Sequence, residues 1–454
     1  MATFVPFNRD QAFLLPPDLK DWLPDDDLAH LIVAACERVD LSAFKVNAQN
    51  GGRAQYHPRM MLALLVYCYA NGTFSSRRIE RATHRDVGVR FVAANTHPDH
   101  DTIAVFRRTN QAAFEAAFLQ VLLMARESGL LAVGNVAIDG TKIDANASKI
   151  KSVRYDRAKA LVAKLKADIA GLVAQAETAD VEGSDPQALP AEIVRREALL
   201  AKLDAACARL EAQAKAQADA EQPTYEEKKS AYEQKGRRGR KPEPPDDDPP
   251  PDRQTNLTDP DSALMRKSKH HEYRQTYNAQ AVVCADGAQL ILATNVARTP
   301  SDQPTFLATM AAIPVAIGKP ACVLADAGFA SGPAVVALQD QGVKALVAIA
   351  KTQPQRPYDF RPPPDPPEPD KPPRRISEPW RQEMKATLET VDAKALYKRR
   401  KHTVEPVFGI VKAAMGFLRF HLRGLDKVKT EWSLVALAYN CRRLVNLKAP
   451  YASV

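Results

Sequence analysis

Three acidic residues, far apart in the chain, have local sequences that suit them for chemistry. Asp139 and Asp326 each end a short apolar segment and precede a glycine by one or two residues, and Glu405 directly precedes Pro406. Carboxylate oxygens are the ligands that hard divalent cations such as Mg²⁺ prefer. Two such ions about 3.5–4 Å apart stabilise the negative charge that develops when a phosphodiester is cleaved and rejoined. The three residues therefore predict a metal centre for phosphoryl transfer.

Each carboxylate taken alone also has an ordinary structural explanation. An aspartate before a glycine is commonly a turn residue, and a glutamate before a proline commonly marks a helix start. The combined arrangement favours catalysis, because two strand-end aspartates are followed by a glutamate and a basic helix. Pro406 suits the first helical position, so we expect Glu405 at the N-cap of a helix that reaches Lys412. Lys412 then lies two turns along the same face, where it can contact a DNA phosphate.

The segments that carry the two aspartates predict strands of one mixed sheet. In Val133–Gly140 the side chain of Asp139 lies opposite the apolar face, and Ala321–Asp326 is a short buried run. Tyr277–Val283 and Leu290–Val296 predict a hairpin between them in the chain. If the first and fourth strands are neighbours, the two aspartates meet at one edge of the sheet.

Helices are expected between and after the later strands. One begins near Asp302, which we expect to act as its cap, and Pro333–Gln341 predicts another before a strand at Ala345–Ala350. The chain from Glu378 onwards is mostly helical in pattern. The resulting order of three strands, a helix, a strand, a helix, a strand and a helix is that of the RNase H-like fold, a mixed α/β architecture.

Residues 1–128 predict a separate all-helical N-terminal domain. Leu28–Cys36, Arg59–Ala70 and Phe106–Arg126 carry apolar residues at helical spacing, the last with Asp101 and Thr102 as its N-cap. A polar, basic segment lies between two of these helices. It is either a helix that contacts DNA or a solvent-facing helix, and its DNA-binding candidates are Arg77, Arg78 and Arg81.

Two insertions are expected to interrupt the catalytic domain, which we assign to residues 129–150 and 273–450. Residues 151–234 predict a helical hairpin, because Asp156–Ala220 carries apolar residues at coiled-coil spacing. Residues 235–272 form a basic, proline-rich linker, expected to be unpacked up to Pro260, and residues 353–379 a proline-rich loop.

The linker contains a short basic motif around a glycine. Arg238 and Arg240 flank Gly239 in a segment that resembles an AT-hook core. Two such arginines can lie along a narrow A·T minor groove. The alternative is a basic linker that only keeps the region soluble.

The bulk properties of the chain suit a polyanionic partner. The chain has 454 residues, enough for two or three structural units, and its formal net charge is +9. No apolar run approaches the roughly 20 residues needed to span a bilayer, and the N-terminus lacks the pattern of a signal peptide. The six cysteines are scattered, which predicts buried thiols in a reducing compartment. We therefore expect a cytoplasmic protein with no membrane partner.

Five segments of the chain resemble bacterial insertion-sequence transposases of the DDE class. Ile138–Ile143, Ala325–Phe329 and Thr403–Gly409 are similar to the three acidic motifs of that family. His271–Gln280 resembles the segment that leads into its second strand, and Trp432–Leu447 resembles its closing helix. The resemblance is strongest to the group with a helical N-terminal domain and a long helical insert after the first aspartate, and it covers most of the chain.

The resemblance implies roles for individual residues. It implies Asp139, Asp326 and Glu405 as catalytic metal ligands and matches Lys412 to a lysine seven positions after the glutamate. Tyr397 and Arg400 lie eight and five residues before Glu405, one position farther upstream than in the family pattern. At the positions of the pattern itself, seven and four residues before Glu405, this sequence has Lys398 and Lys401. Because one residue turns a helix by about 100°, we expect Tyr397 and Arg400 to be displaced from the family's roles. Some basic side chain there still contacts the DNA backbone.

The resemblance also implies the reaction and the partners. It implies metal-dependent cleavage and strand transfer of an insertion sequence, with two Mg²⁺ ions for which Mn²⁺ can substitute. Double-stranded DNA is the expected partner, as terminal inverted repeats and as target, bound by at least a homodimer. Two alternatives stay open at this point: a structure-selective nuclease of the same fold without strand transfer, and a DNA-binding derivative that has lost catalysis.

Overall fold

The computed structural model describes residues 18–46, 55–182, 189–234, 237, 241–266, 271–349 and 378–447. The chain divides into two compact units. Unit 1 comprises Met1–Thr141, Asn278–His421 and Asp426–Val454, and unit 2 comprises Lys142–Tyr277 and Leu422–Leu425. The predicted AT-hook arginines, Arg238 and Arg240, lie outside the described residues, as does the proline-rich loop up to residue 377. All six cysteines are buried and free, as their scattered positions predict.

A mixed sheet forms the centre of unit 1. Its strand order is β6-β5-β1-β7-β8, in which β5 and β6 are antiparallel while β7 is parallel to both of its neighbours. The predicted hairpin and the predicted contact between the first and fourth long strands are both confirmed. The strands are β1 (Asn135–Asp144), β5 (Arg274–Cys284), β6 (Ile291–Ala297), β7 (Cys322–Ala325) and β8 (Lys344–Val347). The first residues of β5 lie in unit 2, where they pair with β4 (Ala263–Met265).

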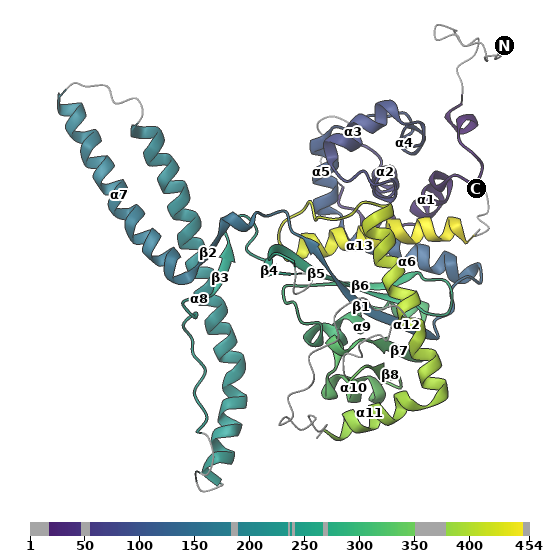
Figure 1. The fold of residues 1–454 in the computed structure, drawn as a ribbon. Coiled ribbons are helices and arrows are strands. Elements are labelled where there is room, and N and C mark those ends of the chain that lie inside the picture. Colours follow the sequence, from purple (N-terminus) through teal and green to yellow (C-terminus); the bar gives the residue numbers. More distant parts are fainter. Residues whose placement is uncertain are drawn as a thin grey trace, which may run out of the picture. The chain divides into compact units, whose positions relative to one another are not determined.

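Helices connect and cover this sheet (Figure 1). Along the chain they are α9 (Phe306–Ala311), α10 (Gly332–Asp340), α11 (Pro379–Glu389), α12 (Val391–Gly409) and α13 (Leu425–Asn446). The last of these protects an edge of the sheet. Asn440 on α13 accepts a hydrogen bond from the Ile291 amide and donates one to the Ile291 carbonyl, each at 2.8 Å. The exposed edge of β6 is thereby covered, which prevents pairing with another chain.

In the described part of the chain before the sheet there are six α-helices. They are α1 (Leu28–Glu37), α2 (Pro58–Ala70), α3 (Ser76–Arg85), α4 (Val87–Val92), α5 (His100–Thr109) and α6 (Gln111–Glu127). The prediction of one helix over Phe106–Arg126 is wrong, because the chain breaks at Asn110. The Asn110 side chain donates to the Phe106 carbonyl at 3.1 Å and accepts from the Lys45 amide at 2.8 Å, so it competes with the helical backbone. Asp99, and not Asp101 or Thr102, caps α5, by accepting from the Thr102 amide at 2.9 Å.

A buried polar network links the N-terminal helices to α13 within unit 1. Glu431 is fully buried and accepts hydrogen bonds from the Tyr69 hydroxyl at 3.0 Å and from the His421 amide at 2.9 Å. The Tyr69 hydroxyl in turn accepts from Arg107, which also donates to the Phe74 carbonyl at 2.7 Å. Burial, followed by the nearby charge of Glu431, raises the pKa of Tyr69, so the phenol stays a neutral donor. The opposite charges of Arg107 and Glu431 are thus joined through one hydroxyl.

We expect Glu431→Ala to destabilise unit 1 by about 3–5 kcal/mol, because the substitution leaves Arg107 buried without its counter-charge. The free energy of unfolding is measured by urea titration, with circular dichroism as the signal. Glu115→Ala is the matched control, since Glu115 is exposed on α6 and its hydrogen bond comes from neighbouring Gln111. A loss for Glu431→Ala no larger than that of the control would contradict the structural importance of the network.

Two long helices dominate unit 2. The helices α7 (Tyr155–Glu182) and α8 (Leu189–Gln234) lie side by side, with a short antiparallel pair of strands, β2 (Ser152–Arg154) and β3 (Gln254–Asn256), beside them (Figure 1). The buried cluster of the helix seam includes Tyr155, Ala158 and Leu165 of α7 and Leu203, Cys207 and Leu210 of α8. None of the described helices combines the length and apolar character that crossing a bilayer requires.

The prediction that the chain is unpacked from Lys235 to Pro260 is wrong at its C-terminal end. Asn256 is fully buried in β3 and donates to the Ser148 carbonyl at 2.8 Å. Asp259 is also fully buried and accepts from the Tyr277 hydroxyl at 2.9 Å. Polar side chains with buried partners hold this segment, which hydrophobic patterning alone does not reveal.

Candidate active site

The two aspartates predicted at strand ends lie next to each other. Strands β1 and β7 are parallel, and their register pairs Ala137 with Leu324. Continuing this register by two residues brings Asp139 level with Asp326 on the same face of the sheet. Each carboxylate also accepts a hydrogen bond from a following glycine amide at 2.8 Å, from Gly140 and Gly328 respectively. These hydrogen bonds to nearby backbone amides hold the two carboxylates side by side. Asp326 directly follows β7, as predicted, but the prediction that Asp139 ends its strand is wrong, because β1 continues to Asp144.

The surroundings of Asp139 oppose its negative charge. Burial raises the pKa of Asp139 to about 6, and the charges of Asp326 and Asp302 act in the same direction. The hydrogen bond from the Gly140 amide and the charge of Arg400 lower the pKa, but do not cancel the increase. Negative charge is thus concentrated at this point beyond what the protein neutralises. A bound cation would relieve the excess.

Glu405 does not begin a helix, so the prediction of an N-cap is wrong. It lies within α12, which runs from Val391 to Gly409 and includes Pro406. A proline inside a helix leaves the carbonyl four residues earlier without its usual partner. Here the side-chain amide of Gln289 donates to the His402 carbonyl at 2.7 Å and replaces the missing hydrogen bond. This partner, distant in sequence, allows the helix to continue through Pro406.

Arg400 joins Glu405 to Asp139. Its guanidinium lies 3.3 Å from an Asp139 oxygen and 3.6 Å from a Glu405 oxygen, and its side chain is 11% exposed. Tyr397 is also directed at the site, because its hydroxyl donates to the Ala325 carbonyl at 3.0 Å, just before Asp326. The expected displacement of these two residues is therefore wrong. Both side chains are long enough to reach the carboxylates in spite of the one-residue difference in spacing.

Lys412, which follows Glu405 in the sequence, contacts strand β1. It lies in a π-helical turn, Ile410–Ala414, that continues α12, and its ammonium group contacts the hydroxyl of Thr141. Thr141 follows Asp139 by two residues in β1, so both side chains are on one face. The structure thus brings Lys412 to the carboxylate-bearing face of β1.

The other predicted DNA-binding residues lie on helix surfaces. Lys401 is exposed on α12. Arg77, Arg78 and Arg81 are exposed on α3, whose buried residues, Ile79 and Thr83, mark the opposite face. The helix therefore presents a basic surface, and whether that surface contacts DNA stays a prediction.

Asp302 belongs to the site and was missed by the sequence analysis. Its side chain makes no helix-capping hydrogen bond, so the expectation that it acts as a cap is wrong. One of its oxygens instead accepts from the amides of Asn278 at 2.6 Å and Gln280 at 2.9 Å, both on β5. The available signal was the alternation in β5, where two polar residues two positions apart share one face of a strand that is otherwise mostly apolar.

The residue types at this site fit a divalent cation. The available donors are carboxylate oxygens, which hard cations prefer, and their summed charge is negative. Within the described part of the chain, however, no three acidic, histidine or cysteine side chains are grouped closely enough to hold an ion as they stand. Arg400 accounts for this, because its guanidinium lies between Asp139 and Glu405.

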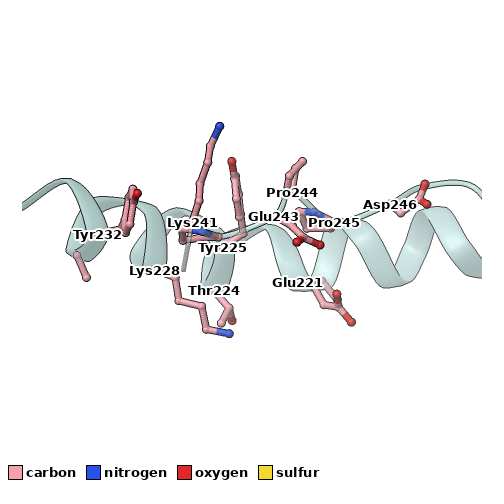
Figure 2. Close-up of a pocket in the computed structure, with 13 residues that line it drawn as sticks. Glu221, Thr224, Tyr225, Lys228, Tyr232, Lys241, Glu243, Pro244, Pro245 and Asp246 are labelled. Atoms are coloured by element: carbon pink, nitrogen blue, oxygen red, sulfur yellow. The ribbon is translucent and has the colours of Figure 1, made fainter. Parts of the chain in front are cut away.

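A groove in unit 2 offers a different environment. It lies between the C-terminal part of α8 and the segment Lys241–Asp246, which runs beside the helix (Figure 2). Prolines of the segment and tyrosines of the helix, among them Tyr225 and Tyr232, line it together with charges of both signs. We assign this groove no catalytic role.

Comparison with known families agrees with the geometry of unit 1. The family model described as the transposase DDE domain matches residues 250–441, and that described as transposase domain (DUF772) matches residues 17–109. The chain belongs to the DDE-class transposases. Neither the search of curated proteins nor the search of solved structures gave a match.

Membership of the DDE transposases makes this chain a DNA-cleaving enzyme whose partner is DNA and whose family typically uses a divalent metal. The larger matched segment contains Asp326 and Glu405, whereas Asp139 lies between the two matched segments. The parallel pairing of β1 with β7 therefore supplies what the family comparison lacks, a position for Asp139 beside Asp326.

Proposed function

We propose that this transposase catalyses metal-dependent cleavage and strand transfer of an insertion sequence on an RNase H-like core. The observation that carries the proposal is the position of Asp139 and Asp326 on neighbouring parallel strands, with Glu405 joined to Asp139 through Arg400. Strand order β6-β5-β1-β7-β8 is the order that an RNase H-like sheet requires. Such a site has the charge and position to act on a phosphodiester.

The reaction consists of two displacements at phosphorus. Water attacks the phosphodiester at the end of the element, a P–O bond forms, and the bond to the 3′ oxygen breaks to release a 3′-hydroxyl. That hydroxyl then loses its proton and attacks a phosphodiester of the target, which releases another 3′ oxygen. The total number of phosphodiester bonds is unchanged in the second step, so strand transfer needs no external energy source.

The protein contributes ligands and positioning. Asp139, Asp326 and Glu405 would hold two Mg²⁺ ions, or Mn²⁺ in their place, which would supply positive charge for the attacking and leaving oxygens. Lys412, Lys401, Arg400 and Tyr397 contact the DNA backbone around the cleaved bond. The excess negative charge around Asp139, expressed in its raised pKa, supports the metal assignment.

DNA recognition is assigned to other parts of the chain. The helical residues 1–128 bind the terminal inverted repeats, with Arg77, Arg78 and Arg81 of α3 at the backbone. Arg238 and Arg240 are proposed to contact a minor groove. Because two element ends must be held together, we propose a homodimer on DNA, with the hairpin of α7 and α8 as an interface.

The test is an assay that detects joined product as well as nicks. Purified protein is incubated with labelled terminal-repeat DNA, a target plasmid and Mg²⁺, and the products are resolved on denaturing and native gels. Joined product supports the transposase. Nicks without joining would instead favour a structure-selective nuclease, and DNA binding without either product would favour a derivative that has lost catalysis.

A further inference from the structure

Asp302 lies close to the backbone that follows each of the two aligned aspartates. A side-chain Cβ added at Gly140 would lie 2.5 Å from one Asp302 oxygen, and one added at Gly328 would lie 3.2 Å from the other. Gly140 directly follows Asp139 within β1, and Gly328 closely follows Asp326 in the turn after β7. Asp302 therefore occupies the space beside these two glycines, and glycine at both positions leaves room for it.

A buried polar chain holds Asp302 in this position. Its Oδ1 accepts from Asn278 and Gln280, both fully buried, and Gln280 is itself fixed by a hydrogen bond from the Thr309 hydroxyl at 2.8 Å. Thr309 in turn accepts from the Asn295 amide at 3.0 Å. Burying so many polar groups is costly unless each is matched, so the sheet has little freedom to move this carboxylate.

The second oxygen of Asp302 is directed into the site. Oδ2 faces Gly328 and receives no hydrogen bond from any described residue. The amide oxygen of Asn278 is also buried without a hydrogen-bond partner in the described part of the chain, close to Gly140. Two oxygens without donors thus lie beside Asp139 and Asp326, where Arg400 is the neighbouring cation that acts on Asp139. Oxygen atoms that receive no hydrogen bond are available as ligands for a cation.

We propose that Asp302 is a fourth acidic residue of the metal centre, with Oδ2 directed to the ion and Oδ1 anchored by Asn278 and Gln280. This inference rests on the proposed metal-dependent function. It adds a ligand that the three-carboxylate pattern lacks. Glu405 is more exposed than Asp139 and is separated from it by Arg400, whereas the charge of Asp302 acts directly on Asp139 and its Oδ2 faces Gly328.

The test measures Mn²⁺ binding to the full chain without DNA, by electron paramagnetic resonance of the free ion. Asp302→Asn keeps the size of the side chain and an oxygen for the two amides, and we expect it to weaken Mn²⁺ binding at least about 10-fold. Asp340→Asn, at the exposed C-terminal end of α10, is the matched control and should bind as the wild type does. Melting curves without metal establish that each variant is folded.

A second measurement needs no variant. Fe²⁺ bound in place of Mn²⁺, with ascorbate and peroxide, generates hydroxyl radicals that cut the backbone near the ion. We expect cuts at residues 301–303 together with cuts near Asp139 and Asp326. Wild-type Mn²⁺ affinity in folded Asp302→Asn, or cuts near the two aspartates without any at 301–303, would overturn the proposal. Absence of Mn²⁺ binding and of joined product in the wild type would overturn the proposed function itself.

Discussion

Replacing Asp139 with asparagine is expected to abolish joined product while making the metal-free protein more stable. Loss of one carboxylate from the metal centre removes several kcal/mol of charge stabilisation, and each 1.36 kcal/mol corresponds to a factor of ten in rate. We therefore expect cleavage to fall by about 10³-fold or more. The substituted amide keeps an oxygen for the Gly140 N–H, so the local hydrogen bond within β1 is preserved.

The stability gain follows from the raised pKa of Asp139. The ordinary pKa of an aspartate is 3.8, whereas that of Asp139 in the folded chain is about 6, so the folded state holds the proton more tightly than the unfolded state. Folding is therefore penalised above about pH 6, and the penalty disappears as the pH falls toward 4. A shift of roughly two units corresponds to at most about 3 kcal/mol. Asparagine avoids this penalty because it carries no charge.

The measurement is thermal or urea unfolding in EDTA at several pH values, alongside the joining assay. The stability advantage of Asp139→Asn should be largest above pH 7 and should vanish near pH 4. Asp144→Asn is the control on the same strand, because Asp144 forms an ion pair with Arg274 at 3.3 Å and has no proposed part in catalysis. A variant that joins DNA at the wild-type rate would remove Asp139 from the active site.

The sequence pattern was sufficient to predict the sheet and its two aspartates. Alternation in the first strand placed the side chain of Asp139 opposite Val136 and Ile138, and a buried run ending at Asp326 predicted a second strand. These signals are local, since each depends on neighbouring residues of one strand. The meeting of the two aspartates depended on the condition that the first and fourth strands are neighbours, and the parallel pairing of β1 with β7 meets that condition.

Features set by contacts distant in sequence could not be predicted in the same way. Pro406 indicates a helix start when read locally, yet the side chain of Gln289 supplies the hydrogen bond that lets α12 continue through it. Asp302 near a proline indicates a cap, yet two amides from β5 hold it in the site. In both cases a side chain from another element decides the local structure.

Arg400 shows how side-chain length limits an argument from helix phase. A shift of one residue rotates a position by about 100°, but the arginine side chain is long enough to compensate, and its guanidinium reaches Asp139 and Glu405. Phase predicts the direction in which a side chain leaves the helix. It does not predict the position of a charge several bonds away from the backbone.

We expect Arg400→Ala to reduce cleavage about 100-fold and to lower stability in EDTA at pH 8 by about 2 kcal/mol. Removal of the guanidinium leaves Asp139 without its counter-charge in a mostly buried position. The stability loss is smaller than for a fully buried pair, because Glu405 is 54% exposed and remains solvated. Arg400→Lys should be intermediate, since one ammonium group cannot contact two carboxylates as a guanidinium does.

A double-mutant cycle separates this role from simple packing. Because Asp139→Asn removes the charge that Arg400 balances, Arg400→Ala should cost much less stability in that background than in the wild type. The pH dependence of cleavage by the Arg400→Ala variant is a second readout. Arg400 lowers the pKa of Asp139, so its removal should raise that pKa further and move the acid limb of the cleavage profile to higher pH. Equal stability losses in both backgrounds, with an unchanged acid limb, would mean that Arg400 only fills space between α12 and β1.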